Sequence, residues 1–270
     1  MKVNTDGVLL AAWLTIPSLR QLELNRLYVL DIGTGTGVIS LILAQRLSQA
    51  LSGMENSSFG ITGIDIDSLS IEDASLNFAS SKWSGHLCAE CISLQEYLSK
   101  YDSLKSPRFS LIVSNPPYFT NSLKAPSERR SDARHNDTLP LSAILAAAET
   151  LLEDGGRLSV ILPPEEGEML IEISDKTNLR ISRLCKVRTL PHKKIKRYML
   201  DFLKNSGSPL SKIGDKSRIE EELTIQSGDG SYTRQYCSLV EDFYTKELRQ
   251  SSGGAPSNKL FWNFRRLKAF

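Results

Sequence analysis

The sequence predicts an α/β protein with a doubly wound, mainly parallel sheet of seven strands, the last of which are antiparallel. Three observations support this fold class. Short strand-like runs alternate with longer segments of helical periodicity. The early strand-like runs are almost continuously apolar, as parallel strands buried on both faces are. This order changes after residue 163, where two strand-like runs follow each other without a long helix between them.

The strand-like and helical segments can be followed in order from residue 26. The run "RLYVLDI" at 26–32 precedes a helical pattern at 36–50, in which Ile39, Ile42 and Leu43 recur at helical spacing. The later predicted strands are 60–65, 109–114, 157–163, 179–190 and 197–204. The later predicted helices are 68–83 and 139–156. The second of them ends at Gly155-Gly156, because paired glycines are a signal for the end of a helix.

The last two strands should form an antiparallel pair, because only the basic segment "PHKKIK" at 191–196 joins them. Beyond this pair, residues 220–248 add a short strand, a glycine-rich turn and a helix with one apolar face. We expect a single domain over 1–248 and a C-terminal tail over 249–270, which begins with a stretch rich in Ser, Gly and Pro.

Composition excludes several classes of protein. The 270 residues are 40% hydrophobic and 24% charged, as in ordinary globular chains, and no apolar run reaches the roughly 18–20 residues of a membrane span. The N-terminus does not resemble an export signal, so we expect a cytoplasmic, monomeric protein. The four cysteines are too few for a disulfide scaffold. Cys88 and Cys91 form a C-x-x-C motif without a second ligand pair, so no metal site is predicted.

A glycine-rich loop follows the first strand, in the segment "LDIGTGTGVIS". Gly33, Gly35 and Gly37 allow a sharp turn and close approach to a ligand at the carboxyl edge of the sheet. The spacing fits a dinucleotide fingerprint poorly because Val38 occupies the third small position, and no Walker lysine follows. Asp31 precedes the loop, and an acid there suits a ligand with an ammonium group and no pyrophosphate. S-Adenosylmethionine is such a ligand.

A second acid stands at the end of the second strand. Asp65 in "GIDID" has the position of the carboxylate that binds a ribose diol in doubly wound folds. Asp67 is a nearby alternative, although it can instead cap the helix that begins at Ser68. Asp31 and Asp65 are therefore the predicted acidic ligands of the cofactor.

The predicted strand at 109–114 ends in the stiff corner "SNPPYF". Pro116 and Pro117 cannot donate ladder hydrogen bonds and hold the chain extended beside the glycine loop. The Asn115 side-chain oxygen and the Pro116 carbonyl could accept both N–H groups of a planar amine, and Tyr118 offers a ring for stacking. Such a corner suits methyl transfer to an exocyclic amine without a general base. By itself it leaves a nucleic-acid base and a glutamine amide as alternative acceptors.

Positive charge is concentrated late in the chain. Residues 176–200 contain nine Lys or Arg and no acid. A run of this kind is either a solvated face or a surface that neutralises nucleic-acid phosphates. Lys193, Lys194 and Lys196 are the predicted phosphate contacts.

The motifs "VLDIGTGTG" and "NPPY" resemble those of the Rossmann-like class I methyltransferases that methylate amino groups. The blocks "MKVNTDGVLLAAW", "R..ARH" and "YT.QY..L..DFY" are more narrowly similar to the bacterial tRNA(Val) adenine-N6 methyltransferases, which modify the adenosine 3′ of the anticodon. The resemblance runs from Lys2 to about Tyr244. It implies that Thr5 and Asp6 approach the methionine end of the cofactor and that Asn115, Pro116 and Tyr118 hold the base.

This sequence departs from the family pattern in three ways. Family members usually begin with a strand-forming segment, so this chain is expected to lack an N-terminal piece. The acid that relatives use to bind the cofactor's adenine amine corresponds to the region of Ser93, which Glu90 and Glu96 flank. The segment after Tyr244 has no counterpart in the family pattern.

RNA is the favoured acceptor because basic residues also follow the corner. The predicted contacts there are Lys124, Arg129, Arg130, Arg134 and His135. Extruding a base from an anticodon loop costs less free energy than extruding one from a duplex. The alternatives are a glutamine-amide protein methyltransferase, a DNA adenine methyltransferase, or a non-catalytic RNA-binding protein with a methyltransferase fold. DNA ranks lower because no separate recognition domain is evident.

Overall fold

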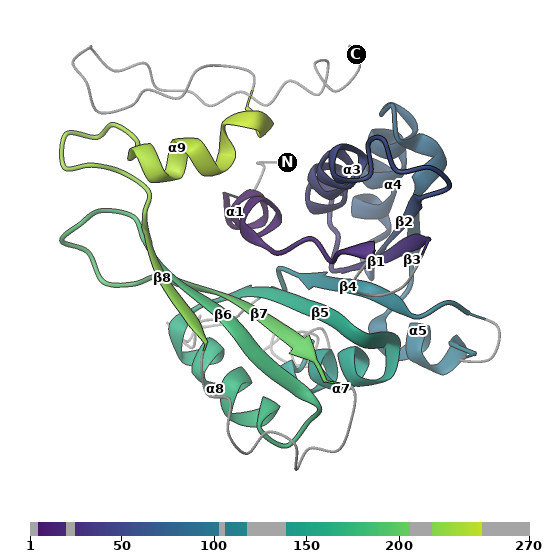
Figure 1. The fold of residues 1–270 in the computed structure, drawn as a ribbon. Helices are drawn as coiled ribbons and strands as arrows, with labels where there is room; N and C mark the ends of the chain where they lie inside the picture. The colour runs from purple at the N-terminus through teal and green to yellow at the C-terminus, as the bar shows by residue number, and fades with distance from the viewer. Residues whose placement is uncertain (1–4, 20–24, 103–105, 118–138, 206–217, 245–270) are drawn as a thin grey trace, which may run out of the picture.

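An eight-stranded sheet organises the molecule, with strand order β3-β2-β1-β4-β5-β7-β6-β8 (Figure 1). The computed structural model describes residues 5–19, 25–102, 106–117, 139–205 and 218–244. The strands are β1 Arg26–Ile32, β2 Ser58–Asp65, β3 Leu87–Cys91, β4 Phe109–Ser114, β5 Leu152–Leu162, β6 Leu179–Arg188, β7 Arg197–Lys204 and β8 Ile219–Thr224. The helices are α1 Thr5–Trp13, α3 Val38–Ala50, α4 Ser68–Ala79, α5 Leu94–Lys100, α7 Leu141–Leu151, α8 Pro164–Ser174 and α9 Arg234–Val240. Short 3-10 turns occupy Ser84–His86 and Glu241–Phe243.

The pairing of the strands confirms the predicted fold class. The first five strands of the chain are parallel to one another, whereas β7 is antiparallel to both β5 and β6. The described sheet has eight strands rather than seven, because β8 joins its edge in parallel with β6. The short strand expected after residue 220 is therefore part of the main sheet.

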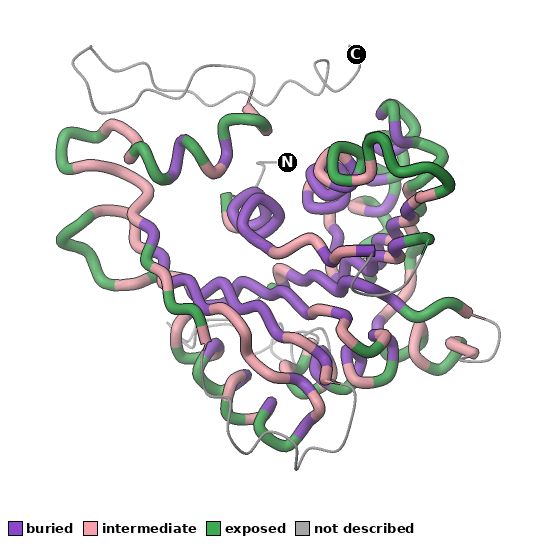
Figure 2. The backbone as a smooth tube through the Cα atoms, in the orientation of Figure 1, coloured by how far each residue is buried: buried purple, intermediate pink, exposed green. Residues whose placement is uncertain are grey.

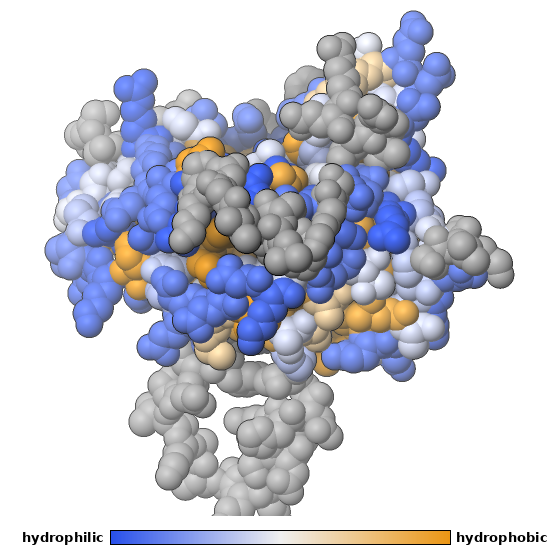
Figure 3. All heavy atoms as spheres, turned by 60° about the horizontal axis from the view of Figure 1, so that its bottom comes forward, coloured by the Kyte–Doolittle hydropathy of each residue, from blue (hydrophilic) through white to orange (hydrophobic). Residues whose placement is uncertain are grey.

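Helices cover both faces of the sheet. Helices α1, α3, α4 and α9 lie on one face, and α5, α7 and α8 lie on the other (Figure 1). The strands between these layers are largely buried (Figure 2). The surface seen from the side of α7 and α8 is mostly hydrophilic where the structure describes it (Figure 3). No helix within the described ranges is long and apolar enough to cross a membrane.

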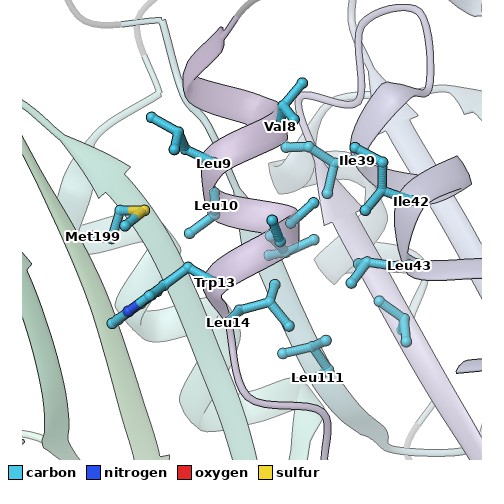
Figure 4. Close-up of a cluster of buried hydrophobic side chains, with 14 of the residues drawn as sticks. Val8, Leu9, Leu10, Trp13, Leu14, Ile39, Ile42, Leu43, Leu111 and Met199 are labelled. Atoms are coloured by element: carbon cyan, nitrogen blue, oxygen red, sulfur yellow. The ribbon is translucent and has the colours of Figure 1, made fainter. Parts of the chain in front are cut away.

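Helix α1 is embedded in the core on the α3 side of the sheet. Its residues from Gly7 to Trp13 are all buried, so it lacks a polar face. Leu9, Leu10 and Trp13 lie among side chains of α3 and of the central strands (Figure 4). A helix that is apolar all round is stable only when it is enclosed, so the packing fixes the position of α1.

Gly155 and Gly156 do not end a helix, contrary to the prediction from sequence. Helix α7 ends at Leu151, and both glycines lie inside β5. Gly155 has a φ of 78°, and the pairing of β4 with β5 shifts register between Phe109 and Leu111. A Cβ on Gly156 would lie 3.1 Å from the Phe109 carbonyl oxygen. The glycine pair therefore accommodates an irregularity in the sheet, a role that the sequence pattern does not distinguish from a helix end.

Candidate functional site

The strand register brings three predicted site residues to one edge of the sheet. Ile32 at the end of β1 pairs with Ile64 of β2 and with Ser114 of β4. The next residue on each strand is Gly33, Asp65 or Asn115. These three residues therefore lie side by side at the carboxyl edge of the sheet, and Gly33, which begins the glycine loop, is in the middle. Open α/β sheets bind ligands at this edge.

The glycine loop is held in conformations that favour glycine. Gly33, Gly35 and Gly37 have φ values of 73°, 55° and 81°. At Gly37 a Cβ would lie 2.3 Å from the Phe78 ring, so contact with α4 excludes a side chain. At Gly33 the corresponding position has no atom within 4 Å. Helix packing therefore accounts for Gly37, whereas Gly33 borders open space that a ligand could fill.

Asp31 is a fully buried carboxylate beneath this loop. Its Oδ2 atom accepts hydrogen bonds from Thr34 Oγ1 at 2.8 Å and from Ser40 Oγ at 2.7 Å. Its Oδ1 atom is buried and has no hydrogen-bond partner among the described residues. Burial raises the pKa of Asp31 to about 6, although both hydroxyls oppose the shift. A buried acceptor without a donor suits a cationic ligand group.

The hydroxyls that hold Asp31 were missed by the sequence reasoning. Both lie inside the segment "LDIGTGTGVIS", and Ser40 interrupts the buried apolar run of α3. The available signal in the sequence was Ser40, a polar residue inside the apolar run that follows the glycine loop.

Asp65 and Asp67 have different partners. Asp65 Oδ2 accepts a hydrogen bond from the Gly35 backbone N–H at 2.9 Å, and its Oδ1 accepts one from the Asp67 N–H at 3.0 Å. Asp67 caps α4 by accepting bonds from the backbone of Leu69 and Ser70. The helix-capping interpretation of Asp67 is thus confirmed, and Asp65 is the acid in contact with the glycine loop.

The region of Ser93, where the family pattern has an acid, forms a helix start. The Ser93 hydroxyl accepts from the Glu96 backbone N–H, and the Glu96 side chain accepts from the Ser93 N–H at 3.1 Å. In this capping box both side chains form hydrogen bonds with the backbone at the start of α5. The Cys88 and Cys91 thiols on β3 are free and exposed. Within the described ranges, no cluster of metal-ligating side chains occurs.

The start of α1 reaches the same edge as the corner after β4. A Cβ on Gly7 would lie 3.8 Å from Asn115 Nδ2, so the two segments are in contact. Thr5 is exposed at the first position of the helix, and Asp6 accepts a hydrogen bond from Arg197 Nε at 2.7 Å. Arg197 begins β7 and was not singled out by the sequence reasoning as a partner of Asp6.

The proline corner is described as far as Pro117. Asn115 is half-buried, Pro116 is buried and Pro117 is exposed. The Ser114 hydroxyl donates to the Ile32 carbonyl oxygen at 2.8 Å and so ties the end of β4 to β1. Six predicted site residues lie outside the described ranges: Tyr118, Lys124, Arg129, Arg130, Arg134 and His135.

The basic run is divided into a paired part and an exposed part. On β6, Arg183 and Lys186 form ion pairs with Glu221 and Glu220 at 3.1 Å and 3.0 Å, and Arg188 pairs with Glu222. These glutamates belong to β8, which sequence reasoning had not connected with the run. Lys193, Lys194 and Lys196 are exposed in the loop before β7.

This loop, residues 189–196, is called the basic loop below. Tyr198 at the start of β7 pairs with Leu162 at the end of β5. Because β7 is antiparallel to β5, the basic loop emerges at the carboxyl edge of the parallel strands, the edge that carries Gly33 and Asn115. The three exposed lysines are therefore on the same side of the sheet as the candidate site.

Comparisons with known proteins identify the family of this chain. Residues 25–207 match a family described as a methyltransferase domain. The chain is 39% identical over 256 residues to the tRNA1(Val) (adenine(37)-N6)-methyltransferase of Porphyromonas gingivalis, covering 92% of this chain and 91% of the relative. The protein of the same name from Photobacterium profundum is 34% identical over 248 residues, covering 91% and 92%.

A solved structure extends the comparison of the fold. A protein of Agrobacterium tumefaciens, described as a predicted O-methyltransferase, superposes with a TM-score of 0.59 at 16% identity, covering 88% of this chain and 96% of its own. At that identity the likeness concerns the fold alone. The sequence relatives are much closer and span nearly the whole chain. The chain therefore belongs to the tRNA1(Val) (adenine(37)-N6)-methyltransferase family.

Proposed function

We propose that this protein transfers a methyl group from S-adenosylmethionine to the N6 amine of adenosine 37 in tRNA1(Val), the position named for its relatives. The observation that carries the proposal is the meeting of Gly33, Asp65 and Asn115 at one sheet edge. We expect the reaction to occur in the cytoplasm, where its tRNA substrate is found, with the protein acting as a monomer.

The described residues fit the proposed cofactor at two points. No donor from the described part of the chain reaches the buried Asp31 Oδ1 atom, and the methionine ammonium group would supply one. Gly33 leaves space where a side chain would stand, and Asp65 beside it would accept hydrogen bonds from the ribose hydroxyls. S-Adenosylmethionine would supply an activated methyl group. The proposed cofactor site comprises Thr5, Asp6, Asp31, Gly33, Gly35, Gly37 and Asp65.

The proline corner would bind the amine that receives the methyl group. Asn115 Oδ1 and the Pro116 carbonyl oxygen would accept its two hydrogen bonds and favour a pyramidal nitrogen, whose lone pair is no longer delocalised into the ring. With S-adenosylmethionine bound, a C–N bond would form as the methyl–sulfur bond breaks, and the nitrogen would then lose a proton to solvent. Pro117 would keep the corner rigid, and Tyr118 would stack on the base.

The RNA backbone would be bound on both sides of the flipped base. The basic loop supplies Lys193, Lys194 and Lys196 at the edge of the site. The proposed contacts after the corner are Lys124, Arg129, Arg130, Arg134 and His135. Phosphate contacts of this kind orient the RNA but do not select the base.

Nucleoside analysis of modified tRNA would test the proposed function. Total tRNA from a strain lacking the gene is incubated with the protein and labelled S-adenosylmethionine, and its nucleosides are analysed by mass spectrometry. We expect labelled N6-methyladenosine in tRNA1(Val) and no incorporation into tRNA from the parent strain, which is already modified. Absence of labelled N6-methyladenosine from tRNA1(Val) of the strain lacking the gene would overturn the proposal.

Replacing Lys193, Lys194 and Lys196 by Ser should weaken tRNA binding and reduce its dependence on salt. Each lost phosphate contact is expected to lower the slope of log K against log salt by about 0.7–0.9. Binding titrations over a range of salt concentrations would measure this change.

Three other exposed lysines provide a matched control for this triple variant. Lys82 follows α4, Lys100 ends α5 and Lys176 follows α8, so all three lie at the opposite, amino edge of the parallel strands. Their replacement by Ser removes the same charge and should alter the slope much less. Equal slopes for the two triple variants would show that the basic loop is only a solvated surface.

A further inference from the structure

Arg197 joins the basic loop to the start of α1. Its Nε donates to Asp6 Oδ2 at 2.7 Å, and its Nη1 donates to the Lys196 carbonyl oxygen at 2.7 Å. The Arg197 and Asp6 side chains are 27% and 17% exposed, so this ion pair is better shielded than most surface pairs. One guanidinium thus contacts both the last residue of the basic loop and an acid of the proposed cofactor site.

The two ends of α1 are held by different arginines. At the C-terminal end, Arg46 Nη1 donates to the Ala11 carbonyl oxygen at 2.6 Å. Arg183 Nη1 donates to the Trp13 carbonyl oxygen at 3.3 Å, and its guanidinium lies 4.4 Å from the centre of the Trp13 ring. These contacts complement the negative end of the helix dipole.

The first turn of α1 is less buried than the rest of the helix and is held by an ion pair. Residues Val8 to Ala11 are completely buried, whereas Thr5 is exposed and Asp6 is half-buried. The first turn therefore projects from the core toward Asn115, which Gly7 contacts. The ion pair of Arg197 with Asp6 ties this turn to β7.

We infer that Arg197 is a positioning residue that holds Asp6 and the first turn of α1 in place at the methionine end of the cofactor. This inference rests on the proposed function, which assigns that end to Thr5 and Asp6. Asp31 and Asp65 also leave carboxylates at this edge. Arg197 offsets part of the negative charge that Asp6 adds to this side of the molecule.

Arg197→Gln should weaken binding of S-adenosylhomocysteine in the absence of RNA by about five- to tenfold, in the range of a partly shielded ion pair. Asp6→Asn should have a similar effect, and the double variant should bind little worse than either single variant, because both changes break one interaction. Arg197→Lys, which keeps the charge, should recover most of the affinity. Isothermal calorimetry would measure these four affinities.

Hydrogen exchange gives a readout that needs no ligand. The amides of Leu9 and Leu10 close the first turn of α1, so Arg197→Gln should speed their exchange relative to those of Ala12 and Trp13. Lys186→Gln is the matched control. It breaks an ion pair on the same hairpin, with Glu220 at 3.0 Å, that does not involve α1. This control should leave both exchange and S-adenosylhomocysteine affinity unchanged.

The outcomes separate this inference from the proposed function. Unchanged cofactor affinity in Arg197→Gln, combined with a salt slope for tRNA binding that falls by about one, would make Arg197 a phosphate contact and overturn the inference. Unchanged affinity together with an unchanged slope would overturn it as well. Failure of the wild-type protein to bind S-adenosylhomocysteine would instead sink the proposed function, and the exchange experiment would still test whether Arg197 holds the first turn.

Discussion

Asn115→Ala is expected to slow methyl transfer by about 100- to 1000-fold, the usual cost of removing one fixed group that stabilises a transition state. The variant loses one of the two acceptors proposed for the amine. Affinity for S-adenosylhomocysteine should stay within a few-fold, because the proposed cofactor ligands lie on the neighbouring strands β1 and β2 and on α1. Single-turnover rates with tRNA and calorimetry with S-adenosylhomocysteine would measure the two effects separately.

Asn25→Ala is the control for this variant. Asn25 is exposed directly before β1, at the opposite edge of the sheet. Its replacement is therefore the same substitution, Asn to Ala, at a position far from the site. It should leave the rate of transfer unaltered. Full turnover by Asn115→Ala would refute the role assigned to the corner.

Asp31→Asn is expected to make the protein more stable and its cofactor binding much weaker, by about 100-fold or more. Burial raises the pKa of Asp31 from 3.8 to about 6, so at neutral pH the folded protein holds an ionised carboxylate that solvent would stabilise better. A shift of that size corresponds to roughly 3 kcal/mol of folding free energy, and the amide removes this cost. The same change removes the negative charge proposed to bind the ammonium group.

The sign of the pH dependence follows from the direction of this shift. Between pH 3.8 and about 6 the folded state retains a proton on Asp31 that the unfolded state has released. The contribution of Asp31 to stability is therefore full below pH 3.8 and is lost as pH rises through about 6. The stability advantage of Asp31→Asn should grow over this interval, and denaturant unfolding of both proteins across it would measure the difference.

Cofactor affinity should change with pH in the opposite sense, rising in the wild-type protein as Asp31 ionises near pH 6. Asp67→Ala serves as the control for stability, since hydrogen bonds led by that of Ser70 lower the pKa of Asp67. Its contribution is present above pH 3.8 and is lost as pH falls, so the two variants should differ from wild type with opposite slopes. An Asp31→Asn protein that binds S-adenosylhomocysteine as tightly as wild type would contradict the assigned role.

The central part of the fold could be predicted because its signals are local. The strands 26–32 and 109–114 are mainly apolar and largely buried, and their ends fix the positions of the glycine loop and Asn115. Strand β3 was harder to delimit because it contains no fully buried residue. Its exposed position at the sheet edge removes the apolar pattern on which the other predictions depended.

The remaining contacts depend on residues far apart in the sequence. Arg197 and Asp6 are separated by 191 positions, and Lys186 and Glu220 by 34. Nothing local to the run 176–200 indicates that glutamates of a later strand will pair with it. Charge composition therefore located the cations of this run, whereas tertiary structure decided which of them are paired with glutamates of β8.

The alignment of β8 with β6 also affects which polyanions the protein can attract. The electrostatic potentials of two paired charges cancel at distances longer than their separation. Salt screens the remaining potential beyond about 8 Å under physiological conditions. A nucleic acid lying along the β6–β8 edge therefore meets charges that are mostly paired, whereas one approaching the end of the hairpin meets the exposed Lys193, Lys194 and Lys196. We expect this separation of charge to favour strands that enter end-on, such as the tip of a stem-loop, over long duplexes that would have to lie flat.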